Sequence, residues 1–341
     1  MRWICHLLVV LLLAGCSNQP DRSAETIRYT GQAMGTSYSV IFEGTTDEAV
    51  SQARVDSLLD ALNESLSTYL TDSIISRVNA SQDTSQGFAL DGHFKRVMDR
   101  SIELHARSGG AFNPALGPLI DAWGFGANGP GATPSDEEIQ HLLSVVDFLA
   151  FRYDPVLPAL QKGHPEAALN FNAIAKGYGV DIVGELLESS GIEDYFVEIG
   201  GEVRTRGQHP EGRPWRVGIE RPAESMLASQ TAQQVVNLGD EAMATSGNYR
   251  NYIERDGQRF THILDPVSGR SKETSMLSAT VIAPDCMTAD AWATAFVVMG
   301  VENALELVES DSSLEAYFIL AGEGDAYDIR MTSGMSSYLS E

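Results

Sequence analysis

The chain has few cysteines, few basic residues and no long apolar segment after its N-terminus. Only 3 of its 341 residues are Cys, which excludes a disulfide-dense scaffold. Its 23 basic residues face 47 acidic ones, and the formal net charge of -24 repels nucleic-acid phosphates, so we expect no nucleic-acid partner. With 43% hydrophobic and 21% charged residues, the chain is neither disordered nor a multi-span membrane protein.

The N-terminal segment has the form of an export signal. Arg2 precedes an apolar run over 7–14 that is too short to span a bilayer as a mature helix. The run ends in Leu-Ala-Gly-Cys at 13–16, which resembles the lipobox of bacterial lipoproteins. We predict a signal peptide over 1–15, lipidation of Cys16, and a polar tether over 16–25 that anchors the protein to a membrane, facing the periplasm. A simple secretory peptide with an incidental Cys is the alternative.

This assignment leaves Cys286 as the sole thiol of the mature chain, so no internal disulfide is expected. A nucleophilic Cys286 paired with a histidine is conceivable on composition alone. A lone Cys is more often a small packed residue, and we favour that interpretation.

The periodicity of apolar residues predicts a mixture of helices and strands. Helices are expected over 55–66, 92–106, 135–146, 179–190 and 287–309. Strands are expected over 38–42, 195–199, 215–220, 234–238, 260–264, 277–283, 316–320 and 326–331. Hairpin-length turns join most of the strands, and the helices are grouped between them, which favours α+β over a doubly wound sheet. We expect one large domain over 26–341, with helices packed on mixed and antiparallel sheets.

Asp290 and Thr294 are four residues apart in a predicted helix, and four steps of about 100° place both side chains on one face. Two hard oxygen donors of this kind suit Mg²⁺. Such a pair is more often solvated, but the residues around it are mostly alanine and other apolar side chains. A buried Asp290 would need a cation or hydrogen-bond donors.

Sequence blocks in a fixed order resemble the ApbE family of flavin transferases. The resemblance covers nearly the whole mature chain and rests on several motifs. They are GQAMGT at 31–36, GGAFNP at 109–114, GPL at 117–119, WGFG at 123–126, AKGYGVD at 175–181, EIGGE at 198–202, TSGNYR at 245–250, THILDPVSG at 261–269 and ADAWAT at 289–294.

The resemblance implies an enzyme that transfers the FMN part of FAD to a Ser or Thr hydroxyl of an exported acceptor protein, releasing AMP. It implies a metal ion, expected to be Mg²⁺, held by the main-chain oxygen of Ala173 and the side chains of Asp290 and Thr294. It also implies residues that line the FAD pocket. These are Met34, Tyr69, Ala111, Phe112, Asn113, Asn170, Lys176 and Leu264.

Two positions depart from the family pattern, which usually has Asp in place of Asn113 and often Asp in place of Asn170. An amide can donate as well as accept hydrogen bonds, so flavin contacts and metal affinity could differ here.

In this interpretation, Asp290 is a catalytic residue because its metal ion would offset charge on the phosphate oxygens, with Lys176 as a second cation. His262 is a candidate base for the acceptor hydroxyl, and it could equally be a packed residue. The family implies a periplasmic redox-complex subunit as acceptor. Two alternatives stay open: an FAD hydrolase that yields FMN and AMP, and a non-catalytic flavin-binding lipoprotein.

Overall fold

The computed structural model describes residues 25–44, 50–127, 129, 131–222, 232–248, 252–255, 258–324 and 326–340. The predicted signal peptide, Cys16 and the tether up to residue 24 lie outside the described residues. The first strand begins at Glu25, the last residue of the predicted tether.

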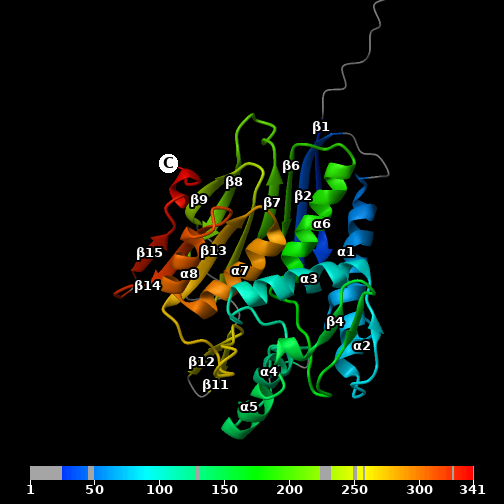
Figure 1. Cartoon of the computed structure of the whole chain (residues 1–341). Coiled ribbons are helices and arrows are strands. Elements are labelled where there is room, and N and C mark those ends of the chain that lie inside the picture. The colour runs from blue at the N-terminus through cyan, green and yellow to red at the C-terminus, as the bar shows by residue number, and fades with distance from the viewer. Residues whose placement is uncertain are drawn as a thin grey trace, which may run out of the picture.

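A central sheet of eight strands organises the fold (Figure 1). Its strand order is β1-β2-β6-β7-β10-β13-β14-β15, and each neighbouring pair is antiparallel. The strands are β1 (Glu25–Ala33), β2 (Thr36–Gly44), β6 (Tyr195–Ile199), β7 (Glu202–Arg206), β10 (Ala242–Gly247), β13 (Met276–Ala283), β14 (Glu315–Ala321) and β15 (Tyr327–Met331).

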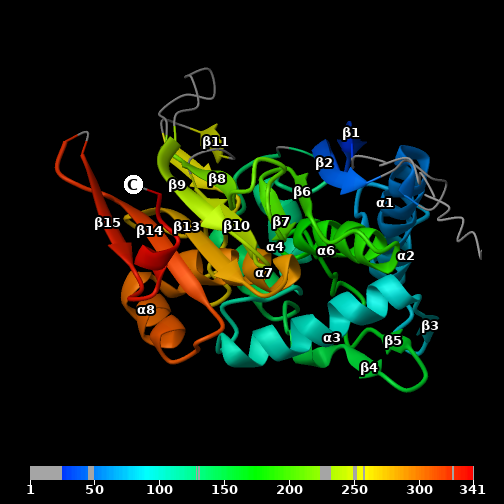
Figure 2. The same ribbon diagram turned by 90° about the horizontal axis from the view of Figure 1, so that it is seen from above.

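Helices cover one face of this sheet, and a hairpin covers the other (Figure 2). On the helical side α6 (Ala175–Ser189) and α7 (Cys286–Met299) contact the strands, with α1 (Gln52–Leu66), α3 (Gly92–Arg107) and α8 (Val301–Glu309) around them. On the opposite side, β8 (Trp215–Glu220) and β9 (Ala232–Leu238) share an apolar cluster with β7 and β13. The part of the sheet around β7 and β13 is therefore buried between two layers, whereas β1 at the edge is largely exposed.

Smaller elements extend from the helical side. They are α2 (Ile74–Ala80), β3 (Phe88–Ala89), α4 (Gly117–Trp123), α5 (Asp136–Leu143), the 3-10 turn η2 (Phe148–Ala150), β4 (Arg152–Asp154), β5 (Ala159–Gln161), β11 (Tyr252–Arg255) and β12 (Gln258–Thr261). A last 3-10 turn, η3 (Met335–Ser337), lies near the C-terminus. No helix in the described ranges has both the length and the apolar character needed to cross a bilayer.

The α+β class with antiparallel sheets is confirmed, but several element predictions are wrong. The single helix expected over 287–309 is broken at Gly300, whose φ of 83° ends α7 before α8 begins. The helix expected over 135–146 stops at Leu143, and only 258–261 of the region around the expected strand 260–264 forms β12. Strands β1, β7 and β10 were not expected, because their sequences are rich in polar or small residues of weak strand preference.

Helix α7 is buried on nearly all sides: twelve of its 14 residues are buried. Its many alanines allow both the sheet and α6 to approach closely, and Trp292 and Phe296 stack on each other inside this layer at 5.1 Å. A polar side chain on α7 must therefore find its partners within the protein.

Candidate active site

The buried helices α6 and α7 contact each other at Gly177. The N–H of Gly177, in the first turn of α6, donates to Oδ2 of Asp290 on α7 at 3.0 Å. A Cβ at Gly177 would lie 2.3 Å from the carbonyl oxygen of Cys286 and 2.8 Å from Cβ of Asp290. Only glycine lets the helices come this close, and Asp290 is consequently just 3% exposed.

Gly177 is the third residue of α6, so its N–H has no acceptor within its own helix, and Asp290 supplies one. The carbonyl of Ala173, which lies just before the N-cap Ile174, accepts no backbone hydrogen bond from the described residues. Ala173 is partly buried at the start of α6. Its oxygen is thus available as a ligand in the same part of the molecule as Asp290.

Thr294 is one helical turn beyond Asp290. Its Oγ1 lies 2.8 Å from Oγ of Ser246, near the end of β10. Asp290 and Thr294 thus lie one turn apart on the same helix, as predicted. Asp290 contacts α6, and Thr294 contacts β10. Ser246 adds a further hydroxyl oxygen, which the sequence pattern did not single out.

Lys176 forms an ion pair with Glu202, the first residue of β7. The Glu202 side chain is only 5% exposed, whereas that of Lys176 keeps 30% of its exposure. Oε2 of Glu202 is buried and has no hydrogen-bond partner among the described residues. The partly exposed lysine therefore pairs with a buried carboxylate.

Burial and neighbouring charges act in opposite directions on this pair. Burial lowers the pKa of Lys176, but the charges of Asp290 and Glu202 outweigh burial and hold that pKa above its usual value. Burial raises the pKa of Glu202, and the charge of Asp290 adds to this, against the opposing effect of Lys176. Lys176 is therefore a stable cation beside Asp290.

Apart from Lys176, the predicted FAD residues lie in four places. Met34 occupies the turn between β1 and β2 with a positive φ of 52°, and its sulfur lies against Gly179 of α6. Tyr69 follows α1 and is 60% exposed, which is unusual for a large aromatic side chain. Leu264 is buried in a cluster with Trp123.

The remaining predicted FAD residues lie on two neighbouring loops. The N–H of Asn170 donates to the carbonyl of Pro114 at 2.8 Å, which places the 111–114 turn beside the loop that leads to α6. The Asn113 amide donates to the carbonyl of Val146 at 3.1 Å and accepts from the N–H of Ala115 at 2.9 Å. One of its two amide N–H donors is therefore used by the protein itself. Phe112 is buried, with 3% exposure, and Ala111 packs against the same core.

His262 lies on the segment that follows β12. Its ring is 6.3 Å from that of Phe125 in an edge-to-face arrangement. Leu264, two residues later, pairs with Ser271 in an isolated bridge that closes the 261–271 loop. The structure thus groups His262 with Leu264 and with the 123–126 block.

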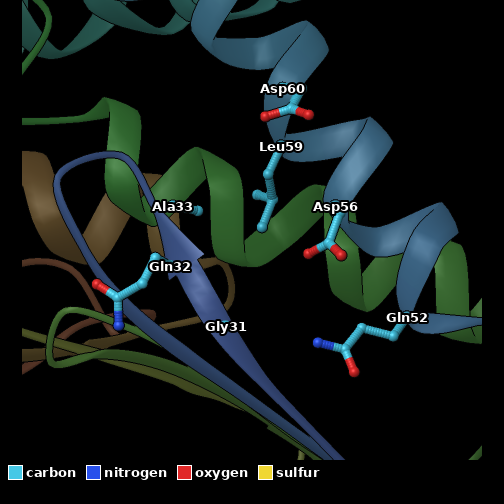
Figure 3. A pocket seen from close by; sticks show the side chains of 7 residues that line it. All are labelled: Gly31, Gln32, Ala33, Gln52, Asp56, Leu59 and Asp60. Carbon is cyan, nitrogen blue, oxygen red and sulfur yellow. The ribbon is translucent and has the colours of Figure 1, made fainter.

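Two cavities border α1. One, of about 290 Å³, lies between β1 and α1 and is lined by polar residues, among them Gln52, Asp56 and Asp60 (Figure 3). The other, of about 570 Å³, is lined by Leu70, the residue after Tyr69, and also by Arg77 and His93. Asp290 and Thr294 line neither cavity.

The described residues contain no group of three or more His, Cys, Asp or Glu side chains that could hold a metal ion. A site made of Ala173, Asp290 and Thr294 would draw on a main-chain carbonyl and a hydroxyl, and so does not require such a group. Cys286 is a free, fully buried thiol whose pKa burial raises well above its usual value, so its predicted role as a packed residue is confirmed.

Comparison with known proteins identifies the family of the chain. The ApbE family model matches residues 34–318. The chain is 38% identical over 315 residues to an FAD:protein FMN transferase of Vibrio cholerae serotype O1, covering 91% of each chain. It is 33% identical over 352 residues to one of Escherichia coli strain K12, covering 98% of this chain and 97% of that one.

Solved structures give the same result. The flavin transferase ApbE of Vibrio cholerae superimposes with a TM-score of 0.82 at 35% identity, over 93% of this chain and 100% of that chain. The apo form of the Pseudomonas stutzeri flavinyl transferase ApbE also gives 0.82, at 34% identity, over 93% of this chain and 97% of that chain. The resemblance noted in the sequence is thereby confirmed, and the chain belongs to the ApbE family.

Proposed function

We propose that this protein transfers the FMN part of FAD to a protein acceptor and releases AMP. The observation that carries the proposal is the α6–α7 junction, where Asp290 accepts the Gly177 N–H and where the Ala173 carbonyl, just before α6, accepts no backbone hydrogen bond from the described residues. Relatives that match nearly the whole chain are named FAD:protein FMN transferase.

The residues at this junction fit a magnesium ion. Asp290 offers a carboxylate, Thr294 a hydroxyl and Ala173 a carbonyl, and Mg²⁺ prefers such oxygen ligands. The unpartnered Oε2 of Glu202 is a further buried acceptor in this region. When bound, Mg²⁺ would neutralise the charge that develops on the diphosphate oxygens. The magnesium requirement is part of the proposal.

Lys176 supplies the second positive charge. Asp290 and Glu202 keep it protonated, and its side chain is 30% exposed. A fixed cation there can bind a phosphate oxygen without being reoriented during the reaction. This also explains how a chain with a formal net charge of -24 can bind an anionic dinucleotide.

The transfer balances without an external oxidant or reductant. The FMN-side phosphorus forms a bond to a Ser or Thr hydroxyl oxygen of the acceptor, while its bond to the bridging oxygen breaks. That oxygen leaves with AMP, and a base takes the hydroxyl proton. We assign His262 as this base, because it shares a loop with the FAD residue Leu264 and because imidazole suits proton transfer near neutral pH.

The flavin half of FAD is assigned to exposed Tyr69 together with the buried and partly buried residues that the family resemblance implies. Exposed Tyr69 offers a ring for stacking, and the cavity of about 570 Å³ beside it is large enough for part of a ligand. Met34, the 111–113 turn, Asn170 and Leu264 complete the pocket in this proposal.

The setting of the reaction is also a proposal. The sequence at 13–16 supports a lipid anchor on Cys16, and an anchored periplasmic enzyme would act on an exported redox-complex subunit. Mass spectrometry of the membrane fraction tests this. The expected species begins at a diacylated Cys16, and an unmodified soluble product would contradict the anchor.

The function is tested by incubating the protein with FAD, Mg²⁺ and an acceptor domain that bears an exposed Ser or Thr. We expect covalent flavin on the acceptor and AMP in equal amount. Free FMN and AMP without labelling would instead show a hydrolase. FAD that stays intact would show a binding protein, and both results contradict the proposal.

A further inference from the structure

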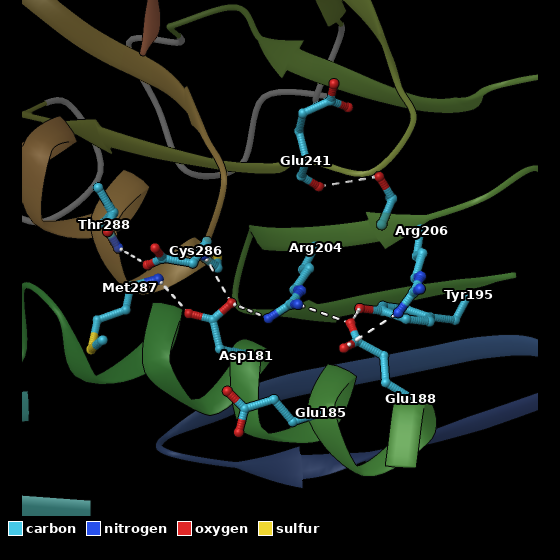
Figure 4. A network of polar contacts seen from close by, with 12 residues as sticks. Asp181, Glu185, Glu188, Tyr195, Arg204, Arg206, Glu241, Cys286, Met287 and Thr288 are labelled. Carbon is cyan, nitrogen blue, oxygen red and sulfur yellow. Dashed lines mark hydrogen bonds and ion pairs between the residues drawn. The ribbon is translucent and has the colours of Figure 1, made fainter. Parts of the chain in front are cut away.

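Asp181 closes the AKGYGVD block, and the proposed reaction gives it no role. It lies on α6, one turn after Gly177, and is 2% exposed. Its Oδ1 accepts the N–H of Cys286 at 2.9 Å, and its Oδ2 accepts the N–H of Met287 at 2.8 Å (Figure 4). These are the first N–H groups of α7, which have no acceptor within their own helix.

Arg204 of β7 holds the carboxylate from the other side. One guanidinium nitrogen lies 3.1 Å from Oδ1 of Asp181, and another lies 2.8 Å from Oε1 of Glu188. The hydroxyl of Tyr195 donates to the same Glu188 oxygen at 2.6 Å. The Arg204 side chain is only 17% exposed, so the network fixes Asp181 against both the sheet and α7 (Figure 4).

Gly177 and Asp181, one turn apart on α6, contact residues that are also one turn apart on α7. Moving four residues along α6, from Gly177 to Asp181, corresponds to moving four residues back along α7, from Asp290 to Cys286. The helices therefore run antiparallel and are joined at two levels, one helical turn apart. Any shift of the start of α7 relative to Asp181 displaces Asp290 relative to Gly177 and Ala173.

We infer that Asp181, held by Arg204, is a positioning residue that sets the place of Asp290 and Thr294 relative to Ala173, and so tunes the affinity for a divalent metal ion. This inference rests on the proposed function, because the metal ligands are those assigned there. It concerns a residue that contacts neither the metal ligands nor the substrate.

Stability alone does not account for this carboxylate. Burial and the charge of Asp285 raise the pKa of Asp181 to about 6, against the opposing effects of the α7 N–H groups and Arg204. A raised pKa means that the folded state disfavours the charged form relative to water. Replacing the carboxylate by an amide of the same shape removes this disfavoured charge, but one α7 N–H loses its acceptor and Arg204 loses an ion-pair partner, so we expect a moderate loss of stability.

The test measures Mn²⁺ binding to the purified, FAD-free protein by electron paramagnetic resonance, together with the Tm. We expect Asp181→Asn to weaken Mn²⁺ binding about tenfold or more while lowering the Tm by only a few degrees. Val236→Ala, in the buried core on the opposite face of the sheet, is the control. It should lower the Tm at least as much and leave Mn²⁺ affinity unchanged.

Unchanged Mn²⁺ affinity in Asp181→Asn overturns the inference. The inference also fails if Val236→Ala loses Mn²⁺ affinity in proportion to its drop in Tm, because affinity would then simply reflect stability. If Asp181→Asn does not fold, Arg204→Gln answers the same question. It should weaken Mn²⁺ binding, and wild-type affinity would overturn the inference. Asp290→Asn separates the proposed metal site from the proposed role of Asp181. If Asp290→Asn keeps wild-type Mn²⁺ affinity, the metal site itself is refuted. If Asp290→Asn weakens Mn²⁺ binding but Asp181→Asn does not, only the role of Asp181 is refuted.

Discussion

The main-chain N–H of Gly177 and the Oδ2 of Asp290 are 3.0 Å apart, and this hydrogen bond joins the start of α6 to the middle of α7. It satisfies one oxygen of a buried carboxylate and gives a partner to an N–H that has no acceptor within its own helix. The contact thus fixes Asp290 of the proposed metal site against the start of α6.

Gly177→Ala tests this contact. The added Cβ would meet the Cys286 carbonyl at 2.3 Å, so α6 and α7 must separate. We expect the free energy of unfolding to fall by about 1 to 3 kcal/mol despite the better helix propensity of Ala. Metal affinity should fall as well. Urea denaturation and Mn²⁺ binding measure the two effects.

Gly92→Ala is the matched control, because Gly92 is also helical and its Cβ would meet nothing within 4 Å. It should leave stability unchanged or raise it by up to about 1 kcal/mol. If the two variants behave alike, close helix packing at Gly177 is not the cause.

His262→Gly tests the proposed base. We expect the transfer rate to fall by about 10²- to 10⁴-fold while FAD and metal affinity change little. Added imidazole should restore part of the rate, because it supplies the missing basic ring. The rescue should be incomplete, because free imidazole is not held in place by the backbone. Stopped assays of acceptor flavin provide the measurement.

A packing role for His262 would show itself in a lower Tm and no imidazole rescue. His141→Asn is the control, since His141 is exposed and pairs with Glu166 on the surface. It should keep the wild-type rate.

The buried Lys162 gives a pH-dependent prediction. The residue is 2% exposed, and its ammonium donates to the carbonyls of Asn79, Ser81 and Pro165. Burial lowers its pKa from 10.5 to about 8. Between these values the unfolded chain binds the proton more tightly, so this residue's contribution to stability rises as the pH increases from about 8 toward 10.5.

Lys162→Met removes this pH dependence and leaves three carbonyls without their donor. At neutral pH we expect a loss of about 2 kcal/mol in unfolding free energy. Across the alkaline range, wild-type stability should increase relative to the variant. A constant difference between the two denaturation curves would contradict the assignment.

Asn113→Asp returns one departure to the usual family residue. The Asn113 amide donates to the Val146 carbonyl at 3.1 Å, and a carboxylate would face that oxygen without a donor. We expect unfolding free energy to fall by about 1 to 3 kcal/mol. Asn170→Asp is the control, because its Oδ1 accepts the Asn172 N–H and its amide donates no hydrogen bond within the described residues. Equal losses in both variants would count against this explanation.

The sequence predicted the parts of the fold that follow a clear period. Val55, Leu59 and Leu62 mark one buried face of α1, and the 195–199 strand was predicted with its observed bounds. The break at Gly300 was missed, because the apolar pattern continues across it and a single glycine in a helix is tolerated.

The candidate site was only partly predictable. The spacing of Asp290 and Thr294 was visible, since both lie on one helix. Glu202, Ser246 and Asp181 were not given roles, because they reach the site from β7, β10 and α6 through contacts between distant segments. A single sequence carries no signal of such contacts, although all three lie within the blocks that indicated the family.

The central claim is that oxygen ligands on α7, held against α6, bind the metal ion that transfers FMN. The most direct measurement is acceptor flavinylation and AMP release as a function of Mg²⁺ concentration, for the wild type and for Asp290→Asn. The wild type should saturate with Mg²⁺, and the variant should fold with a similar Tm but lose at least about a hundredfold in rate. Flavinylation by the variant at the wild-type rate, or transfer by the wild type in excess chelator, would contradict the account.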